Sequence, residues 1–468
     1  MKPFDLIIGA ALGVGLAACA SVETQDDLAN VADTAPAKLV EDSGLDIVVH
    51  EGDFAEIQQF TTPGGVSVWL VSEPSIPILS VAMAWEGGEA ADPEGLEGLA
   101  DAVVYHMNEG AGDLDSLAFQ TRMEDLNMSF GCSASSDWTS CSASMLTDNA
   151  DEAMSLVAQA FEAPRFDAGP FARFQREREV SLNTRETNAR YLAGRAEAQA
   201  IYPDHPYARE TSAESIAALT PELAKAHMRK LMVKDSLIVT AVGAITPEEL
   251  APMLDAIAES LPESNDLPET PEITFTVDGA FEPVLIDLPQ PQSLVRFLAP
   301  GLKREDPDFF TAYVVNYTYG GGGFGSRLME SLRVQKGLTY GVYTWLSFDD
   351  TYQNWGGSGQ TKNESVGEFV EALLAETALI AEEGITAEEL ADAKAYLTGS
   401  YPLAFDSNAK IAGQMMSVRQ DELGVDYFDR RNALIEAVTL EDANRVAAEF
   451  LQPDRFSFIM VGQPEGLD

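Results

Sequence analysis

The spacing of apolar residues along the chain predicts alternating strands and helices. Short runs rich in β-branched and aromatic residues, such as Gly65 to Val71 and Ile78 to Trp85, predict strands. Between them lie longer segments in which apolar residues recur at three-to-four residue spacing, the periodicity of amphipathic helices. The pattern therefore predicts an α+β fold of mixed or antiparallel sheets with helices on one face.

The same pattern occurs twice. Residues 216–243 align without a gap on residues 435–462, and both segments contain a threonine that can cap a helix and a closing apolar strand that ends in Val-Gly. The same offset places Asp167 on Thr386, each a candidate N-cap of an amphipathic helix. Agreement at one offset in separate segments predicts a duplicated domain of about 200 residues.

Composition shifts mark the boundaries of these domains. Prolines and polar residues crowd residues 262–272, which are predicted to be a linker between an N-terminal domain, residues 46–261, and a C-terminal domain, residues 273–468. Residues 20–45 are rich in Ala, Asp, Glu and Thr without sustained periodicity. This composition is typical of a flexible tether.

The N-terminal segment, from Met1 to Cys19, predicts export. An apolar run from Leu6 to Ala18 follows an early lysine, and small residues precede Cys19, which resembles a bacterial lipoprotein signal with its lipobox. We expect a lipidated Cys19 and a periplasmic protein anchored to a bacterial membrane, with Ala20 favouring the outer membrane. The alternative is an ordinary cleaved signal peptide with an incidental cysteine.

The charge of the chain excludes one class of partner. It has 76 acidic and 29 basic residues, a formal charge of -47, which repels nucleic acid and anionic lipid surfaces. The same charge is consistent with a strongly solvated surface or with attraction of cationic peptides. Composition does not separate these two interpretations.

The two remaining cysteines, Cys132 and Cys141, flank Ser136-Asp137 symmetrically. A hairpin with its turn at these two residues would place the cysteines directly opposite each other across the ladder. In an exported protein this predicts either a structural cross-strand disulfide or two free buried thiols.

The run from Gly95 to Met107, GLEGLADAVVYHM, resembles the zinc-motif helix of pitrilysin/insulinase-type metallopeptidases. In the subgroup resembling mitochondrial processing peptidase, that motif reads G-L-A-H-x-x-E-H, with two histidines binding zinc and a glutamate activating water. This chain keeps Gly-Leu-Ala, but Asp101, Val104 and Tyr105 replace the first histidine, the glutamate and the second histidine. The resemblance therefore implies a family member that has lost its hydrolytic site and binds no metal.

Two neighbouring features do not restore a site. His106 is one residue late and lies about 140° from Asp101 around a helix, so we expect a surface or interface histidine and not a ligand. The family's third ligand, a glutamate, would fall near residues 180–185, where Glu179 and Glu186 are off register. Segment 202–216 also resembles the family, in positions that we interpret as structural.

A second set of family residues is retained in the C-terminal half. Gly320-Gly321-Gly322-Gly323, followed by Arg333 and Tyr340, resembles the family's glycine-rich loop and its arginine/tyrosine pair. By resemblance, Arg333 and Tyr340 would bind the substrate backbone and help a partner's zinc site hold the scissile carbonyl, for which both are suitable donors. The glycine amides could pair with an extended peptide. The alternatives are a flexible loop or a phosphate cradle, but the run lacks the Gly-Lys-[Ser/Thr] ending of a P-loop.

The resemblance implies half of a clam-shell peptidase that encloses a chamber with a second, homologous chain. We therefore expect a non-catalytic, substrate-binding subunit of a heterodimeric periplasmic zinc peptidase, with no cofactor of its own and with zinc in the partner. One alternative is a purely structural or peptide-binding homologue. Another is an active metallopeptidase with a relocated site that uses Asp101, His106 and nearby acids.

Overall fold

The computed structural model describes residues 38–40, 44–52, 54–273, 281–348 and 351–467. Cys19, the predicted signal and most of the predicted tether lie outside these residues, so lipidation and export remain predictions. Within the described ranges, no helix is both long and apolar enough to cross a membrane.

The first sheet is a mixed sheet in the N-terminal half. Its strand order is β1 (Lys38–Val40), β2 (Ile47–Glu51), β3 (Glu56–Thr61), β4 (Ser67–Ser72), β8 (Ile238–Gly243), β5 (Ile78–Glu86), β7 (Trp138–Leu146) and β6 (Ser129–Ala134). Neighbouring strands are antiparallel except β4 and β8, which are parallel. Because β1 pairs with β2, part of the predicted tether belongs to this sheet.

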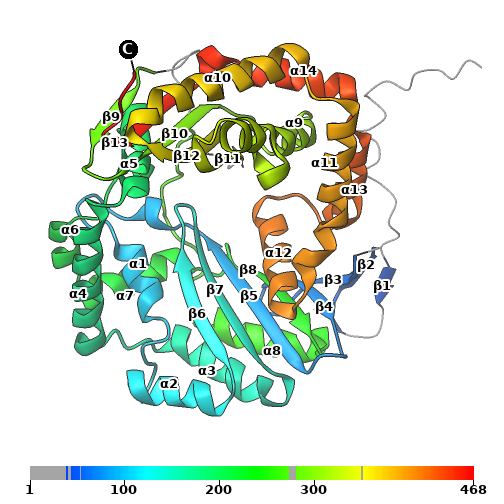
Figure 1. The fold of residues 1–468 in the computed structure, drawn as a ribbon. Coiled ribbons are helices and arrows are strands. Elements are labelled where there is room, and N and C mark those ends of the chain that lie inside the picture. Colours follow the sequence, from blue (N-terminus) through cyan, green and yellow to red (C-terminus); the bar gives the residue numbers. More distant parts are fainter. Residues whose placement is uncertain (1–37, 41–43, 53, 274–280, 349–350, 468) are drawn as a thin grey trace, which may run out of the picture. The chain divides into compact units, whose positions relative to one another are not determined.

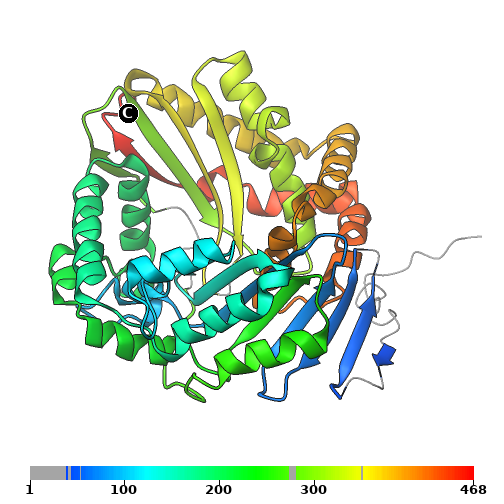
Figure 2. The ribbon, with the colours of Figure 1, turned by 90° about the horizontal axis from the view of Figure 1, so that it is seen from below.

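The second sheet, whose strands run from green through yellow to red in Figure 2, repeats this topology. Its order is β11 (Thr339–Phe348), β12 (Gln353–Lys362), β10 (Gln292–Pro300), β13 (Ser457–Gly462) and β9 (Val284–Asp287), and β13 and β9 are its parallel pair. These strands correspond in order and direction to β6, β7, β5, β8 and β4. The structure therefore confirms the predicted duplication.

The helices follow the same repeat. The N-terminal half contains α1 (Leu99–His106), α2 (Ser116–Asp125), α3 (Ala150–Glu162), α4 (Ala168–Arg185), α5 (Ala189–Ile201), α6 (Ala213–Ala218), α7 (Pro221–Leu231) and α8 (Pro247–Ala258). The C-terminal half contains α9 (Phe309–Asn316), α10 (Val366–Glu383), α11 (Ala387–Gly399), α12 (Asn408–Gln420), α13 (Tyr427–Ala437) and α14 (Leu440–Phe450). The first residues of the pairs α4/α11, α5/α12 and α7/α14 are all separated by the offset of the sequence repeat.

The two halves exchange one helix each. Helix α12 contacts β5 and β8 of the first sheet, and its counterpart α5 contacts β13 and β10 of the second sheet (Figure 1). Apolar residues from both partners form shared cores, such as Met415 of α12 with Trp69 and Val242, and Leu192 of α5 with Leu294 and Ile459. Each sheet therefore carries its own helices on one face, as predicted, and a helix from the other half on the opposite face.

Buried polar contacts accompany both exchanged helices. Arg419 of α12 donates hydrogen bonds to the carbonyls of Ser67 and Val239 at 3.0 and 2.7 Å, and burial lowers the pKa of its guanidinium to about 10. Glu197 of α5 forms an ion pair with Arg296 of β10. These contacts link charged groups of one half to polar groups of the other, in addition to the apolar cores that the halves share. The fold therefore holds residues 37–468 together as one compact unit.

Candidate functional site

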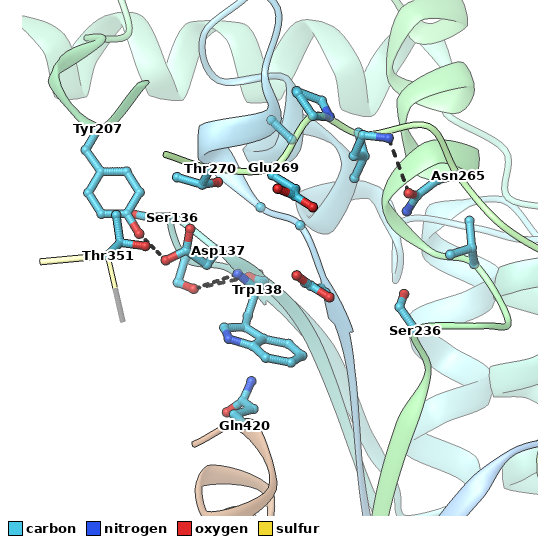
Figure 3. Close-up of a pocket in the computed structure, with 18 of the residues that line it drawn as sticks. Ser136, Asp137, Trp138, Tyr207, Ser236, Asn265, Glu269, Thr270, Thr351 and Gln420 are labelled. Atoms are coloured by element: carbon cyan, nitrogen blue, oxygen red, sulfur yellow. Dashed lines mark hydrogen bonds between the residues drawn. The ribbon is translucent and has the colours of Figure 1, made fainter. Parts of the chain in front are cut away.

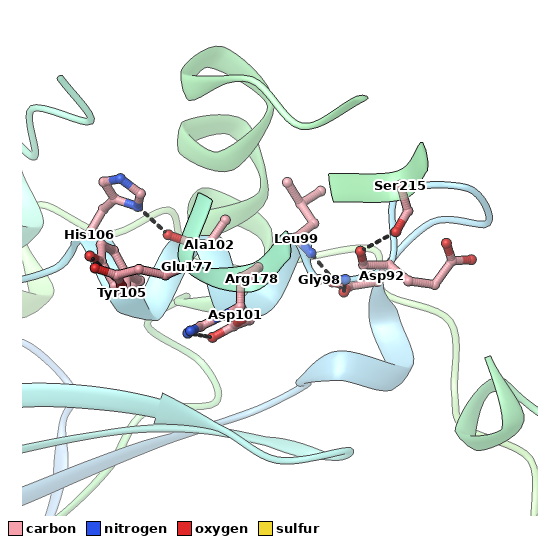
Figure 4. A network of polar contacts seen from close by, with 11 residues as sticks. Asp92, Gly98, Leu99, Asp101, Ala102, Tyr105, His106, Glu177, Arg178 and Ser215 are labelled. Atoms are coloured by element: carbon pink, nitrogen blue, oxygen red, sulfur yellow. Dashed lines mark hydrogen bonds and ion pairs between the residues drawn. The ribbon is translucent and has the colours of Figure 1, made fainter. Parts of the chain in front are cut away.

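The N-terminus of α1 is fixed by a buried carboxylate. Asp92, which is 3% exposed, accepts hydrogen bonds from the backbone amides of Gly98, Leu99 and Ala100 at 2.8, 2.9 and 2.8 Å (Figure 4). Its other close contact is the imidazole of His227, with 3.1 Å between Nε2 and Oδ1. A carboxylate at this position satisfies three amides that have no partner within the helix and complements the helix dipole. The helix that resembles the zinc-motif helix is thus firmly positioned.

Two of the three motif positions on α1, Asp101 and Tyr105, contact α4, and these contacts are made between protein side chains. Asp101 forms a bidentate ion pair with Arg178, with 2.8 Å between Oδ1 and one terminal nitrogen (Figure 4). The Tyr105 hydroxyl donates to Glu177 at 3.1 Å, and Arg173 donates to it at 3.0 Å. The hydrogen bond from Arg178 to Asp101 raises the pKa of Arg178, so this guanidinium stays charged. Arg173 also pairs with Glu109, 2.6 Å apart. The carboxylates beside α1 are therefore bound by guanidinium groups, with which a divalent cation would have to compete.

A metal-ligand set is not found where the family would have one. Among the residues that the structure describes, no three or more His, Cys, Asp or Glu side chains are grouped so that they could hold a metal ion. The α4 residues that meet the motif positions are Arg173, Glu177 and Arg178. All three residues lie before residues 180–185, the segment in which we expected the family's third zinc ligand. Val104 is buried and apolar, so it cannot act as a base.

His106 is a core residue, and the expectation of a surface or interface histidine was wrong. Its side chain is completely buried, its Nδ1 lies 2.7 Å from the carbonyl of Ala102, and its ring stacks on Phe166 and Phe171. Burial lowers the pKa of this imidazole, which favours the neutral form. Because Asp101 is held by an arginine and His106 by phenyl rings, the structure gives no support to a relocated metal site built on these two residues.

The glycine-rich loop lies between two unusual helical segments. Residues Tyr317–Gly321 and Met329–Gln335 both form π-helical turns, the first continuing α9 and the second containing Arg333. Such turns are rare and are frequently found at functional sites. Strand β11, which carries Tyr340, contacts both segments, so the structure brings the three retained family features together.

A close backbone contact requires glycine at one position of this loop. A Cβ atom at Gly322 would lie 2.6 Å from the carbonyl oxygen of Tyr317, so any side chain there would force the backbone apart. A Cβ atom at Gly321 would first meet the side-chain amide of Asn316, 2.7 Å away, and one at Gly323 would meet nothing within 4 Å. The alternative of a flexible loop does not fit the close contact at Gly322.

Arg333 and Tyr340 have side chains available to a ligand. In the described part of the chain, no carboxylate lies within ion-pair distance of Arg333, and its guanidinium carbon lies 4.4 Å from the centre of the Phe324 ring. Tyr340 is 83% exposed. The pairing of β11 with β12 shifts register between Thr339 and Val342, and a bulge of this kind redirects the intervening side chain. Both residues are therefore positioned to donate hydrogen bonds outward.

The sequence did not identify two sets of residues around these sites. Arg173 and Arg178 belong to a charged stretch of α4 that is typical of a solvated helix face, and their partners on α1 lie far earlier in the chain. Phe324, the ring under Arg333, stands out only as a lone aromatic residue among glycines.

A separate cavity of about 1020 Å³ lies between the two halves (Figure 3). Its lining includes the turn of the β6–β7 hairpin, with Asp137 and Trp138, part of the segment that joins α8 to β9, and Gln420. Carboxylates dominate the charged groups of this lining, and the basic residue, Arg304, is buried against the Phe309 ring. None of the predicted substrate-binding residues lines this cavity, so it is distinct from the glycine-loop site.

The fold is a duplicated peptidase scaffold. On α1, the helix that resembles the zinc-motif helix, contacts with α4 side chains stand where the family has metal ligands. Two family sequence models match the chain: "Insulinase (Peptidase family M16)" over residues 67–213 and "Peptidase M16 inactive domain" over residues 218–397. The chain belongs to the M16 family, and the substitutions at Asp101, Val104 and Tyr105 make it a non-catalytic member.

Individual relatives agree with this assignment. The chain is 28% identical over 331 residues to a "Non-peptidase homolog YmxG" of Helicobacter pylori, covering 70% of this chain and 76% of that protein. It is 21% identical to a mitochondrial-processing peptidase subunit beta of Blastocladiella emersonii, covering 86% and 88%. A crystal structure of a peptidase M16 inactive domain from Pseudomonas fluorescens matches with a TM-score of 0.80 and 26% identity, covering 88% of this chain and 98% of that one.

One structural relative is longer. The periplasmic protease PqqL of Escherichia coli matches with a TM-score of 0.76 and 17% identity, covering 92% of this chain but 48% of PqqL. At this identity the match shows the fold alone. The present chain thus corresponds to about half of that protein.

Proposed function

We propose that this chain is the substrate-binding, non-catalytic subunit of a heterodimeric zinc peptidase that degrades peptides in the bacterial periplasm, anchored to a membrane, favoured to be the outer one, through a lipidated Cys19. One contrast carries the proposal. Arg333 and Tyr340 retain available donors on a tightly specified backbone, whereas Asp101 and Arg178 satisfy each other at the family's metal position.

The chemistry of the two retained residues fits a supporting role. A guanidinium and a phenol aimed outward can donate hydrogen bonds to the backbone carbonyls of an extended peptide and to the oxyanion that develops during amide hydrolysis. The partner's zinc would polarise the scissile carbonyl and activate water. In this division, the present chain binds and orients the peptide.

The comparisons support the compartment and the assembly only by analogy. PqqL is described as a periplasmic protease, and the present chain spans about half of its length. A second, homologous chain would supply the other half of the clam shell that the family resemblance implies. The N-terminal lipoprotein-like signal supports the same compartment.

The decisive experiment measures zinc content and hydrolysis of a quenched, unstructured peptide by this chain, by its zinc-motif partner and by their mixture. We expect hydrolysis only in the mixture, with zinc stoichiometric to the partner. Hydrolysis or stoichiometric zinc in this chain alone would overturn the proposal. Inactivity of every combination, with assembly intact, would favour the purely structural or peptide-binding role.

A further inference from the structure

The Phe324 ring occupies a position that core packing does not explain. It is 70% exposed, although burial of a phenyl ring normally stabilises a fold by about 2 kcal/mol. The turn that carries it is closed by Ser326, whose amide and hydroxyl donate to the carbonyl of Gly323 at 3.1 and 2.8 Å. The ring is therefore held at the apex of an ordered turn and faces Arg333.

Two arginines near the glycine-rich loop are held in different ways. Arg327 donates to both carboxylate oxygens of Glu389 at 2.7 Å and to the carbonyl of Gly384 at 2.9 Å, which uses three of its five in-plane N–H donors. Arg333 is held by a ring, with 4.4 Å from its guanidinium carbon to the ring centre. A ring face attracts the cation without accepting its N–H groups in the plane, so those donors stay available.

Two kinds of partner hold arginines in the described part of the chain. Some, such as Arg178 and Arg445, pair with carboxylates, whereas others, such as Arg304 and Arg431, lie against aromatic rings as Arg333 does. A carboxylate at Arg333 would neutralise the guanidinium and compete with any ligand, whereas an aromatic ring fixes its position and leaves its charge in place.

We propose that Phe324 is a positioning residue that holds the Arg333 guanidinium in place to receive a carboxylate or carbonyl oxygen of an extended peptide. The inference rests on the proposed peptide-binding function and adds a residue to it. Phe324 acts through Arg333, so its effect must disappear when the arginine is removed.

The test is a double-mutant cycle on peptide binding by the chain alone, with fluorescence anisotropy of a fluorescein-labelled, unstructured peptide as the readout. Phe324→Leu keeps an apolar side chain but removes the ring face, and we expect it to weaken binding about 2- to 5-fold. Phe324→Trp should retain or tighten binding. In an Arg333→Ala background, Phe324→Leu should have no further effect.

Val334→Ala is the matched control, because Val334 is 62% exposed and adjacent in sequence to Arg333. We expect it to leave binding unchanged. A structural readout accompanies the cycle: in protein with ¹⁵N-labelled arginine, Phe324→Leu should shift the Arg333 Nε–H resonance, because the ring current is lost.

The outcomes separate this inference from the proposed function. The inference is overturned if Phe324→Leu weakens peptide binding equally in the presence and in the absence of Arg333. It is also overturned if the Nε–H resonance does not move, even if the mixture hydrolyses peptide. Coupled loss of binding in the chain alone, with an inactive mixture, would support the inference and overturn the catalytic-support role. Failure of the unsubstituted chain to bind the peptide would overturn the inference.

Discussion

The α1–α4 contact and the glycine-rich loop occupy related positions in the two repeats, but they use their charged groups in opposite ways. On α1, Asp101 and Tyr105 are bonded to arginines and a glutamate of α4. At the loop, Arg333 rests on a ring and Tyr340 is mostly exposed. A site released from metal binding can pair its charges internally, while a site that still binds a ligand must leave donors available.

The energies of the two regions differ accordingly. The Asp101–Arg178 pair has good bidentate geometry, and both side chains are 30% exposed, so it contributes about 1 kcal/mol to stability. The glycine-rich loop, in contrast, lowers the stability of the fold, because its glycines lose much conformational entropy on folding and its phenyl ring stays exposed. Such a cost is typical of a functional site.

The largest expected effect is at Arg333. Arg333→Ala should lower kcat/KM of the mixed complex about 100- to 1000-fold, because a donor to the developing oxyanion is lost, while assembly stays intact. Peptide hydrolysis and size-exclusion chromatography measure the two quantities. The matched control is Lys336→Ala, which removes the same charge three residues away. Unchanged turnover in Arg333→Ala would show that the available donor at the glycine-rich loop has no more part in catalysis than the paired groups of α1 and α4.

The next effect concerns the hairpin beside α1. The structure joins Cys132 of β6 to Cys141 of β7 by a disulfide, and β11–β12 contains no cysteine. Replacing both cysteines with serine should lower the free energy of unfolding by about 2–3 kcal/mol, because the unfolded chain loses a crosslink. Urea denaturation under oxidising conditions measures the change. Replacing Ser133 and Ser140, the adjacent opposed pair, with alanine should have a much smaller effect.

A smaller effect is expected from the Tyr340 hydroxyl. Tyr340→Phe should lower kcat of the mixed complex about 10-fold, because one hydrogen bond to the reacting carbonyl is lost and the ring remains. Tyr343→Phe, on the same strand and 47% exposed, is the matched control and should leave kcat unchanged. An equal fall of kcat in both variants would indicate that the Tyr340 hydroxyl has no specific role.

The smallest expected effect comes from grafting the family motif onto α1. The triple variant Asp101→His, Val104→Glu and Tyr105→His should contain less than stoichiometric zinc and should not hydrolyse peptide, because the guanidinium groups of Arg173 and Arg178 remain beside the site. Metal analysis and the quenched-peptide assay test this. Adding Arg178→Gln should raise zinc retention. Activity in the triple variant alone would show that α4 supplies a third ligand after all.

The fold was predictable to the extent that its signals are local. Helix caps and apolar spacing recur at one fixed offset along the chain, and helices of the two halves begin at that same offset. The exchange of α5 and α12 was not predictable, because the apolar spacing of a helix does not specify which sheet it packs against. Only packing in three dimensions selects the sheet of the other half.

The error at His106 has a similar origin. Residues 101 and 106 lie on different sides of α1, and sequence reasoning assigned the second side to solvent. In the structure, phenyl rings from the segment that begins α4 cover that side and bury the imidazole. A helix packed on several sides buries more than one face, which the apolar periodicity of so short a helix does not reveal.

The sequence by itself determined the repeat, the loss of zinc ligands at Asp101, Val104 and Tyr105, and the retention of the glycine run with Arg333 and Tyr340, because each is a statement about residue identity at a known spacing. Only the tertiary structure decided that Arg178 neutralises Asp101 and that Phe324 lies beneath Arg333. The physical reason is that the energy of a charge depends on its neighbours in space, and those neighbours are set by long-range packing.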